Sequence, residues 1–569
     1  MTDYKDIALA TPRLDDSQIR FRLGLATQRT RNYPLDDLDF VMIDLERPEG
    51  RHRHADWCTG DLTGRLLEFL SYSAGVNGET DPRLPELFER ILQQRRPSGL
   101  FGRYASQAQE HIPPEDDFRS GIPRLLPGFL RYYQLTNDER ALEAAVGMAE
   151  FTLSRVDEWR AHLEAWHGLT IEAWVGEPLA MLYSLTGDQK YLDFLAMIEE
   201  LLEPLDYPVH AHGYLSTLRG LQTAALVTGD NGWNTKVEQH RQTIIERRYE
   251  LPDGSVPECF PASIRTEGCA IADWMMLNLN AGLITGDDAA YARAEHVLWN
   301  ALAFNQWITG CFGSRQTTAH GYGVYQMEEC VWCCVHNGGL AFTEYARQAV
   351  TWRDGAIHVN LLVPGTYRLE MPGGTETEVK ISTTFPATAD AVVEISGVPP
   401  EVDVHMRVPA SVRNPQLSEQ RDGARVTTRL TGNIGHYVES GARGAMLKYG
   451  PLVLVPVAYS WTGPSATEAE RHAAPSGYIP DQMPEGLPTL RVGDADADGL
   501  LDLPDRPLPD WTFVDEGPGG KCWVPGAAAN VDVRFPNDEE RTLRFVPQCY
   551  FTSCLALHDT PVVFNAVEL

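Results

Sequence analysis

A short motif recurs four times in the first half of the chain, each time directly after an apolar stretch with helical spacing. The copies are Leu135-Thr-Asn-Asp, Leu185-Thr-Gly-Asp, Val227-Thr-Gly-Asp and Ile284-Thr-Gly-Asp, at intervals of 50, 42 and 57 residues. Gly, or Asn in the first copy, favours the left-handed conformation that ends a helix, and the neighbouring Thr or Asp can cap the next one. Each interval has room for about two helices with their connections, which predicts a series of helical hairpins.

Such a series forms either an open α-solenoid or a closed α/α toroid. Polar and aromatic residues start several of the helices, as in Glu164-Ala-Trp-His-Gly and His210-Ala-His-Gly-Tyr. Each cluster alone suits an ordinary helix start with a buried imidazole. In a toroid, however, the inner helices begin around one end of a central cavity, where these clusters would form a polar pocket. We therefore favour an (α/α)6-type toroid over residues 57–352.

After Trp352 the hydrophobic pattern changes from helical spacing to alternation with a period of two. The alternating stretches are Ile357–Val363, Glu378–Thr384, Ala391–Ile395, Val402–Val408 and Arg425–Leu430. Turns rich in Gly and Pro separate them, which predicts a β-sandwich over residues 353–457. We expect residues 1–56 to be an irregular lead-in packed on the toroid, and residues 458–569 to be a loop-rich segment followed by a C-terminal β module.

The net charge of the chain is −31, which repels phosphate backbones and acidic membranes, so we expect neither nucleic acid nor a membrane as partner. No apolar run is long enough to span a bilayer, and Met1–Ala8 lacks a basic segment followed by an apolar one, so we expect a cytoplasmic protein. In that reducing compartment, cysteines more often bind metals, catalyse reactions or lie buried than form disulfides. A homodimer formed through the β region is one option for the assembly.

Six of the ten cysteines lie between Glu258 and Asn337. Glu267-Gly-Cys269 puts two donors on one face of an extended segment, and Gly268 lets the backbone bend around an ion. Cys333-Cys334 adds two thiols, which completes a four-ligand set of the kind that zinc prefers. Cys330-Val-Trp-Cys333 is also a Cys-x-x-Cys, so a redox role or a ligand role for Cys330 stays open. We expect the scattered cysteines to be packing residues: Cys58, Cys311, Cys522, Cys549 and Cys554.

The same residues carry a resemblance to a known family. Glu267-x-Cys269, Thr-Gly-Asp followed by Tyr-Ala, Asn300 and Cys333-Cys334-x-x-Asn337 together resemble glycoside hydrolase family 127, the β-L-arabinofuranosidases and their relatives. The resemblance covers about residues 57–350 and continues loosely into the β region, through Met406-Arg-Val-Pro-Ala and Tyr449-Gly-Pro-Leu-Val-Leu. The chain departs from the family pattern in a shorter spacing between Glu258 and Glu267, in Val335-His336 where prolines are common, and in the register of Cys330.

The resemblance implies a zinc ion held by Glu267, Cys269, Cys333 and Cys334, with Cys333 as nucleophile and Glu258 as acid/base. A retaining glycosidase needs a nucleophile on one face of the anomeric carbon and a proton donor near the leaving oxygen. Zinc would keep the Cys333 thiol deprotonated, and Glu258 would protonate the leaving group and then activate water. Imidazoles suit sugar hydroxyls and aromatic rings suit sugar C–H faces, so the candidate sugar contacts are His167, His210, His212, His336, Trp166 and Trp332.

The leading hypothesis is therefore a zinc-dependent glycosidase that releases a β-L-arabinofuranosyl or related sugar from a carbohydrate or glycoconjugate. A sugar epimerase or lyase on the same toroid is the alternative enzyme, and such enzymes rely on His, Tyr or carboxylates without a zinc–thiolate centre. Lanthionine-type cyclases need a Cys-His-Gly element, which this sequence lacks. A non-catalytic carbohydrate-binding protein with structural zinc would instead have four closed ligands and no function for Glu258.

Overall fold

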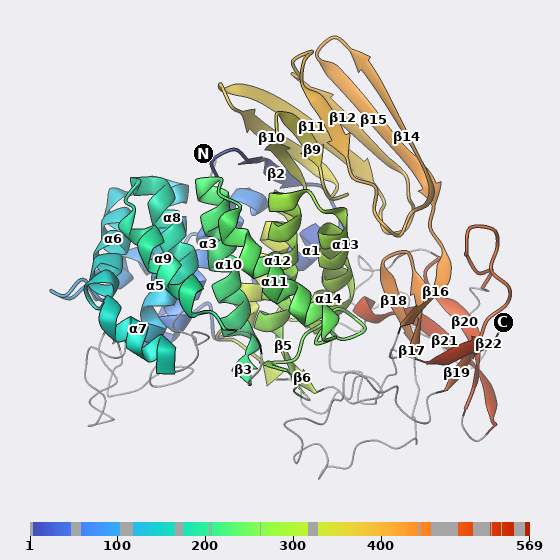
Figure 1. Ribbon diagram of the computed structural model, residues 1–569, viewed down its shortest axis with the longest axis horizontal. Coiled ribbons are helices and arrows are strands. Elements are labelled where there is room, and N and C mark those ends of the chain that lie inside the picture. Colours follow the sequence, from blue (N-terminus) through green and yellow to red (C-terminus); the bar gives the residue numbers. More distant parts are fainter. Residues whose placement is uncertain are drawn as a thin grey trace.

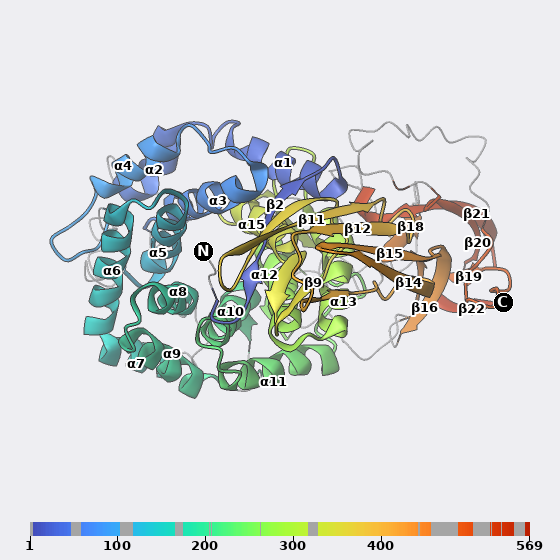
Figure 2. The same cartoon turned by 90° about the horizontal axis from the view of Figure 1, so that it is seen from above.

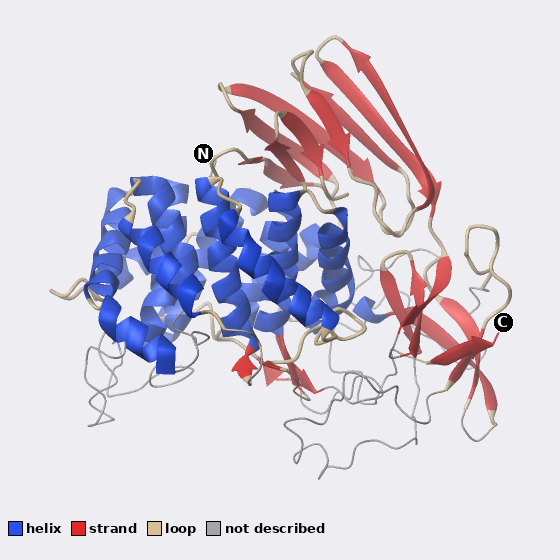
Figure 3. Cartoon of the chain, viewed as in Figure 1, coloured by secondary structure: helices blue, strands red, loops and turns tan. Residues whose placement is uncertain are grey.

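The protein consists of a mainly helical part followed by a mainly β part (Figures 1 and 3). The computed structural model describes residues 4–46, 59–102, 118–165, 174–203, 205, 208–261, 263, 265–316, 328–441, 444–456, 488–503, 524, 526–535, 538–550 and 564–568. The predicted division into a helical domain and a β domain is confirmed. The domain boundaries themselves stay a prediction.

The helices of the described residues lie almost entirely before residue 348. They are α1 (Gln18–Thr30), α2 (Leu38–Glu46), α3 (Asp61–Asn77), α4 (Leu84–Leu92), α5 (Phe118–Thr136), α6 (Glu139–Ser154), α7 (Val156–Ala165), α8 (Gly176–Thr186), α9 (Lys190–Leu201), α10 (Ala211–Thr228), α11 (Gly232–Glu246), α12 (Gly268–Thr285), α13 (Asp288–His296), α14 (Ala303–Asn305) and α15 (Cys334–Arg347). A π-helical turn, Val297–Leu302, joins α13 to α14.

Helices α3, α5, α8, α10, α12 and α15 each pack on the next in this order, and α15 also packs on α3. Most of them pack in addition on a helix that is their neighbour in the chain: α6 on α5, α9 on α8, α11 on α10 and α13 on α12. Seen from above, α6, α7, α9 and α11 lie along the outside of the helical part (Figure 2). Alternate helices thus form an inner and an outer layer over this stretch.

The repeated motif ends one helix in all four copies. Its aspartate is the N-cap residue of the next helix in two of them, Asp138 before α6 and Asp287 before α13, and in the other two the N-cap residue follows the aspartate. The left-handed residue is Gly187, Gly229 or Gly286, with φ of +71° to +74°, and Asn137 with φ of +57° in the first copy. In each copy the threonine hydroxyl donates to the carbonyl four residues earlier and accepts the N–H of the following aspartate. That aspartate accepts the N–H two residues further on. The predicted stop and cap signals are confirmed.

The strands form three larger sheets and two small ones. The small sheets contain β3 (Val209–His210), β4 (Cys259–Phe260), β5 (Arg265–Glu267), β6 (Gly313–Gln316) and β7 (Glu328–Glu329). In Figure 1, β3, β5 and β6 lie below the helices, at the end away from the large sheet that contains β10 (Gly365–Met371), β11 (Thr375–Thr383) and β12 (Ala391–Ser396). Since β3 leads into α10 and β5 into α12, these helices begin at that lower end.

The larger sheets are mainly antiparallel. Strand β10 buries one face, whereas β17 and β18 are buried on both faces. Their strands are β1 (Ala8–Leu9), β2 (Thr11–Leu14), β8 (Val350–Arg353), β9 (Ala356–Val359), β10 (Gly365–Met371), β11 (Thr375–Thr383), β12 (Ala391–Ser396), β13 (Asp403–Met406), β14 (Arg413–Asp422), β15 (Arg425–Asn433), β16 (His436–Gly441), β17 (Gly444–Tyr449), β18 (Leu452–Pro456), β19 (Thr489–Arg491), β20 (Ala529–Arg534), β21 (Glu540–Pro547) and β22 (Asn565–Glu568). Each alternating stretch of the sequence overlaps one of them, although Ile357–Val363 continues past the end of β9 at Val359. Of residues 458–487, the structure describes none.

The N-terminal segment is not the irregular lead-in that the sequence predicts. Its described part contains α1 and α2, and its two strands join the large sheets: β1 pairs with β8, and β2 pairs with β10. Helix α1 packs on α15. These two strands are too short to be recognised from a local hydrophobic pattern. Their pairing partners come more than 300 residues later in the chain. Among the described helices, none is long and apolar enough to cross a membrane.

Candidate active site

The four predicted zinc ligands lie at the start of two helices that pack together. Glu267 ends β5 and is the N-cap residue of α12, with Cys269 in the first turn. Cys333 is the N-cap residue of α15, and Cys334 is its first residue. The amino end of a helix carries partial positive charge, which stabilises thiolates and carboxylates placed there.

Gly268 allows the two helix starts to approach each other. A Cβ atom added to it would lie 2.8 Å from Asn305 Oδ1 and 3.2 Å from the Cβ of Cys334. Gly268 is not among the glycines with positive φ, so this close approach, rather than the expected bend around an ion, is the reason for a glycine here. Asn337 of α15 fixes the contact by donating a hydrogen bond of 3.1 Å to the carbonyl of Cys269.

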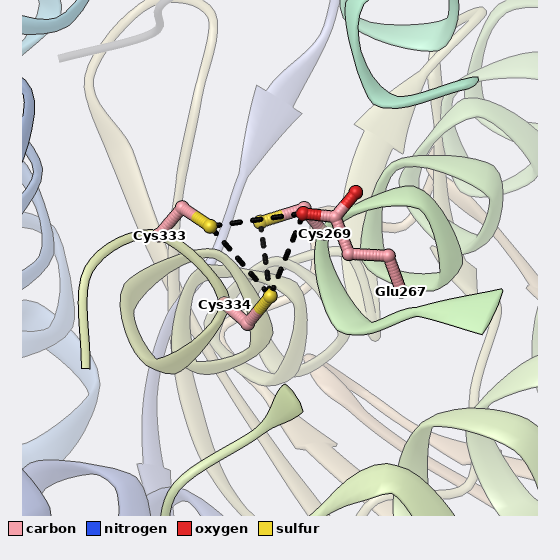
Figure 4. A group of neighbouring side chains, drawn as sticks. All are labelled: Glu267, Cys269, Cys333 and Cys334. Atoms are coloured by element: carbon pink, nitrogen blue, oxygen red, sulfur yellow. Dashed lines mark hydrogen bonds between the residues drawn. The ribbon is translucent and has the colours of Figure 1, made fainter. Parts of the chain in front are cut away.

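The donor atoms of Glu267, Cys269, Cys333 and Cys334 all lie within 4.8 Å of one another (Figure 4). Cys269 Sγ is 3.5 Å from Cys334 Sγ, Cys333 Sγ is 3.7 Å from Cys334 Sγ, and Glu267 Oε1 is 3.7 Å from each of these last two sulfurs. Sulfurs about 2.3 Å from a tetrahedral zinc ion are about 3.8 Å apart. The cluster therefore has the size and the donor set of a zinc site.

Burial and charge in this cluster favour a bound cation. Glu267 is 7% exposed and Cys333 is 5% exposed, while Cys269 and Cys334 have no exposed surface. Burial opposes ionisation of Glu267, but its hydrogen bond with His210 and the nearby His212 and Arg65 hold its pKa at about 2. The hydrogen bond between Cys333 and Cys269 raises the pKa of Cys333 to about 11. A cation among the four donors would reverse that shift, because positive charge stabilises the thiolate.

A tight hairpin brings Glu258 to this cluster in spite of its short spacing from Glu267. The N–H of Glu258 donates to the carbonyl of Arg265 at 2.7 Å, and its carbonyl accepts the N–H of Ala211 at 2.8 Å. The backbone of Glu258 is thus held from two sides. One of its carboxylate oxygens lies within 4.8 Å of donor atoms of both His210 and Glu267.

His210 supports the ligand carboxylate. Its Nε2 lies 3.1 Å from Glu267 Oε2, the oxygen that does not face the two sulfurs. Its Nδ1 is buried and has no hydrogen-bond partner among the described residues. A histidine that fixes a metal-binding carboxylate in this way sets the direction of the ligand lone pairs.

His212, two residues further on, belongs to a buried charged network between the helices. Its Nδ1 contacts Asp273 on α12, and its Nε2 lies 2.9 Å from Arg124 and 3.4 Å from Arg65. Burial lowers the pKa of His212, against the effect of Asp273. Both ring nitrogens therefore already have protein partners, although a sugar contact for His212 stays a prediction. The network was not foreseen; its one sequence signal is Asp273, a single charge within the otherwise uncharged α12.

The remaining predicted residues lie around the start of α15. His336 is fully buried, its Nδ1 donates to the carbonyl of Trp332 at 2.9 Å, and burial lowers its pKa to about 3. The Trp332 ring stacks on Phe40 with 6.1 Å between ring centroids. Cys330 Sγ is 3.3 Å from Cys333 Sγ, so it adjoins the ligand set without completing it. Cys311 and Cys549 are buried, as expected. His167, Trp166, Cys58, Cys522 and Cys554 lie outside the described residues.

Comparison with known proteins identifies the family. The family model described as beta-L-arabinofuranosidase, GH127 catalytic domain, matches residues 45–347, just over half of the chain. The chain belongs to glycoside hydrolase family 127. The predicted resemblance and the predicted class of enzyme, a glycosidase, are thereby confirmed.

Solved structures of family 127 share the fold over the whole chain. A β-L-arabinofuranosidase from Geobacillus stearothermophilus T6 gives a TM-score of 0.70 at 13% identity, covering 98% of this chain and 100% of that one. Another family 127 β-arabinofuranosidase gives 0.67 at 13% identity, covering 100% and 99%. A structure described as a glycoside hydrolase gives 0.65 at 13% identity, covering 99% and 98%. No curated protein matches the chain in sequence.

Proposed function

We propose that this family 127 member is a retaining glycosidase in which Cys333 is the nucleophile. Its substrate would be a carbohydrate or glycoconjugate that carries a β-L-arabinofuranosyl or related sugar. The observation that carries the proposal is the buried cluster of three thiols and one carboxylate, at two helix N-termini, with Glu258 beside it. Glu267, Cys269, Cys333 and Cys334 would hold a zinc ion, which would supply positive charge that keeps Cys333 ionised at neutral pH.

Accessibility supports Cys333, rather than another thiol, as the nucleophile. Cys269 and Cys334 have no exposed surface, whereas Cys333 is 5% exposed. Of these three residues, Cys333 is therefore the one that keeps some exposed surface for an incoming sugar. In the first step the Cys333 sulfur would form a bond to the anomeric carbon while the bond from that carbon to the leaving oxygen breaks.

The position of Glu258 supports its role as acid and base. Glu267 connects the two groups, because it lies 3.7 Å from Cys333 Sγ and within 4.8 Å of a Glu258 carboxylate oxygen. Retaining glycosidases need their two catalytic groups only about 5 Å apart, since no water has to fit between nucleophile and sugar. Glu258 would give its proton to the leaving oxygen and later take one from the water that releases the sugar.

The packing order of the helices supports an (α/α)6 toroid as the finer description of the helical domain. Six helices contact one another in sequence, α15 returns to α3, and partner helices lie outside them. The large sheets support a β-sandwich in the same way, because β10 packs on β1 and β8 of another sheet. None of the described cysteines forms a disulfide. A cytoplasmic location stays a prediction.

The first test is the zinc content per chain of wild type, Cys333→Ala and Cys269→Ala, with Cys311→Ala as control. Cys311 is equally buried but lies outside the donor cluster, so its variant should keep zinc. Stoichiometric zinc that is lost only from the first two variants is the expected result. An absence of zinc from the reduced, folded wild type would rule out the proposed activation of Cys333.

The second test compares wild type with Glu258→Gln on a panel of furanosides, at equal zinc content. Glu258→Gln should fail to hydrolyse the furanosides that the wild type hydrolyses, because Gln cannot transfer a proton. A purely structural zinc site predicts instead that Glu258→Gln changes nothing. Family membership favours hydrolysis over the epimerase and lyase alternatives.

A further inference from the structure

Arg265 faces Glu258 across the hairpin that carries the proposed acid/base. Pro257 pairs with Thr266 in an antiparallel bridge, and the N–H of Glu258 donates to the carbonyl of Arg265. Glu258 and Arg265 are therefore directly opposite each other. Side chains of opposite residues in an antiparallel pair lie on the same face of the sheet, about 5 Å apart at Cβ. Glu267, two residues after Arg265, lies on that face as well.

The guanidinium of Arg265 connects Glu258 to the neighbouring strand. Its Nε lies 3.1 Å from Glu258 Oε2, and its Nη2 donates to Ser314 Oγ at 2.8 Å. Ser314 belongs to β6, where it pairs with Glu267. Because the guanidinium is planar and rigid, two contacts at different nitrogens fix its orientation and with it the position of the Glu258 carboxyl.

Without the Arg265 contact, the Glu258 carboxyl could adopt two orientations that do not suit proton transfer to the substrate. One of its oxygens lies within 4.8 Å of donor atoms of both His210 and Glu267, so it could turn toward the proposed metal site as an additional ligand. It could also turn away into solvent, because the neighbouring Glu267 carboxylate repels it once it is ionised. Arg265 attracts the carboxyl through the contact of 3.1 Å between its Nε and Glu258 Oε2 and so opposes both movements.

We propose that Arg265 is a positioning residue that, anchored by Ser314, holds the Glu258 carboxyl toward the leaving oxygen of the substrate. The inference rests on the proposed acid/base function of Glu258 and adds the residue that makes it effective. A purely structural role fits the geometry less well. The side chain of Arg265 is 43% exposed, and ion pairs with so much solvent contribute little to stability.

The dependence of the rate on the leaving group tests this proposal. Departure of methanol from methyl β-L-arabinofuranoside needs a proton from Glu258, whereas 4-nitrophenolate leaves the corresponding 4-nitrophenyl glycoside without one. The value of kcat/KM reports the steps up to transfer of the sugar to Cys333. The ratio of kcat/KM for the two glycosides therefore measures proton donation alone, because damage to the fold lowers both values equally.

The variants are Arg265→Gln, Arg265→Lys, Ser314→Ala and Glu258→Gln. In Arg265→Gln the methyl to 4-nitrophenyl ratio should fall about 10–100-fold, a part of the 100- to 10,000-fold that general acid catalysis contributes. In Arg265→Lys the ratio should fall less, since lysine keeps the positive charge. In Ser314→Ala the ratio should fall about 3–10-fold, since one of the two contacts that orient the guanidinium is removed. The matched control is Arg31→Gln. Arg31 is 40% exposed and its Nε lies 3.1 Å from Asp81, so it loses an equivalent ion pair elsewhere.

The outcomes separate the two proposals. If Glu258→Gln lowers the ratio but Arg265→Gln does not, the positioning role is refuted and the acid/base role stands. If Glu258→Gln leaves the ratio unchanged, Glu258 is not the acid and both proposals fall. An equal decrease of both kcat/KM values in Arg265→Gln, with the ratio unchanged, would assign Arg265 a structural role only.

Discussion

Removal of the His210 side chain should weaken zinc binding without removing a ligand. In the structure, Glu267 Oε1 faces the sulfurs of Cys333 and Cys334, and Glu267 Oε2 accepts a hydrogen bond from His210 at 3.1 Å. His210→Ala leaves all four donors in place but frees the carboxylate to rotate. The consequence should be a weaker site of unchanged composition.

The expected size of the effect follows from the contact that is lost. Hydrogen bonds to groups that orient a metal ligand change metal affinity by about 10- to 100-fold, which is about 1.4–2.7 kcal/mol. The His210 side chain is 34% exposed, so water replaces part of the lost interaction. We therefore expect the lower end of the range, about a tenfold increase in the Kd for zinc. His210→Gln should recover part of it, because its amide can donate to the same oxygen.

Competition for zinc with a chromophoric chelator at neutral pH measures this Kd directly. The control is His405→Ala, which removes a histidine of strand β13, far from the cluster in the chain. Cys334→Ser removes one of the four proposed ligands and should weaken binding far more. The reasoning is refuted if His210→Ala binds zinc as tightly as wild type while Cys334→Ser does not.

Three further predictions concern the framework of the site. Gly268→Ala should lower the free energy of unfolding by about 1–3 kcal/mol, because the added methyl group overpacks against Cys334, and it should also lower the zinc content. Calorimetry and metal analysis measure these two quantities, and unchanged values of both would contradict the close approach. Asn300 is fully buried, donates to Pro451 O at 3.0 Å and accepts the N–H of Val453 at 2.7 Å. Asn300→Ala should therefore lower the free energy of unfolding by about 2–5 kcal/mol. A loss below about 0.5 kcal/mol would show that water replaces the amide. Burial lowers the pKa of His240 to about 4 and that of His296 to about 3 from the usual 6.5. Below pH 6.5 the two histidines therefore bind protons in the unfolded chain but not in the folded one, so the Tm should fall as the pH decreases from 6.5 toward 4. A constant Tm over that range would contradict the neutral, buried state of both rings.

The parts of the molecule that sequence alone predicts are those that local chemistry determines. The Thr-Gly-Asp copies could be interpreted because the left-handed glycine, the threonine and the capping aspartate satisfy one another within a few residues. The ligand pairs Glu267–Cys269 and Cys333–Cys334 are local in the same sense, since each pair sits on one helix start. Their residue types predict a metal site, and the structure brings the four donor atoms within 4.8 Å of one another.

The parts that sequence did not predict depend on pairing between distant segments. Strands β1 and β2 are too short to show a hydrophobic alternation that predicts a strand. They form by pairing with β8 and β10 at the edges of their sheets. The spacing of Glu258 and Glu267 is shorter than in the family pattern, and only the register between the segments around Pro257 and Thr266 puts both residues on one face. Arg265 had no sequence signal at all, because its partner becomes a neighbour only through that register.

The proposed zinc site would account for the positive groups around its four donors through charge balance. Three thiolates and a carboxylate around a zinc dication carry a net charge of −2, which is costly to bury unless nearby positive groups compensate it. Two helix N-termini supply part of that compensation. Arg65 supplies another part: burial opposes its charge, but Asp61, Cys269 and Cys333 hold its pKa well above the usual value. His212 contacts Arg65 and also Asp273, the carboxylate to which Asn337 connects α15. The buried network therefore does two things at once: it balances the charge of the ligand set and ties together the two helix starts that hold it.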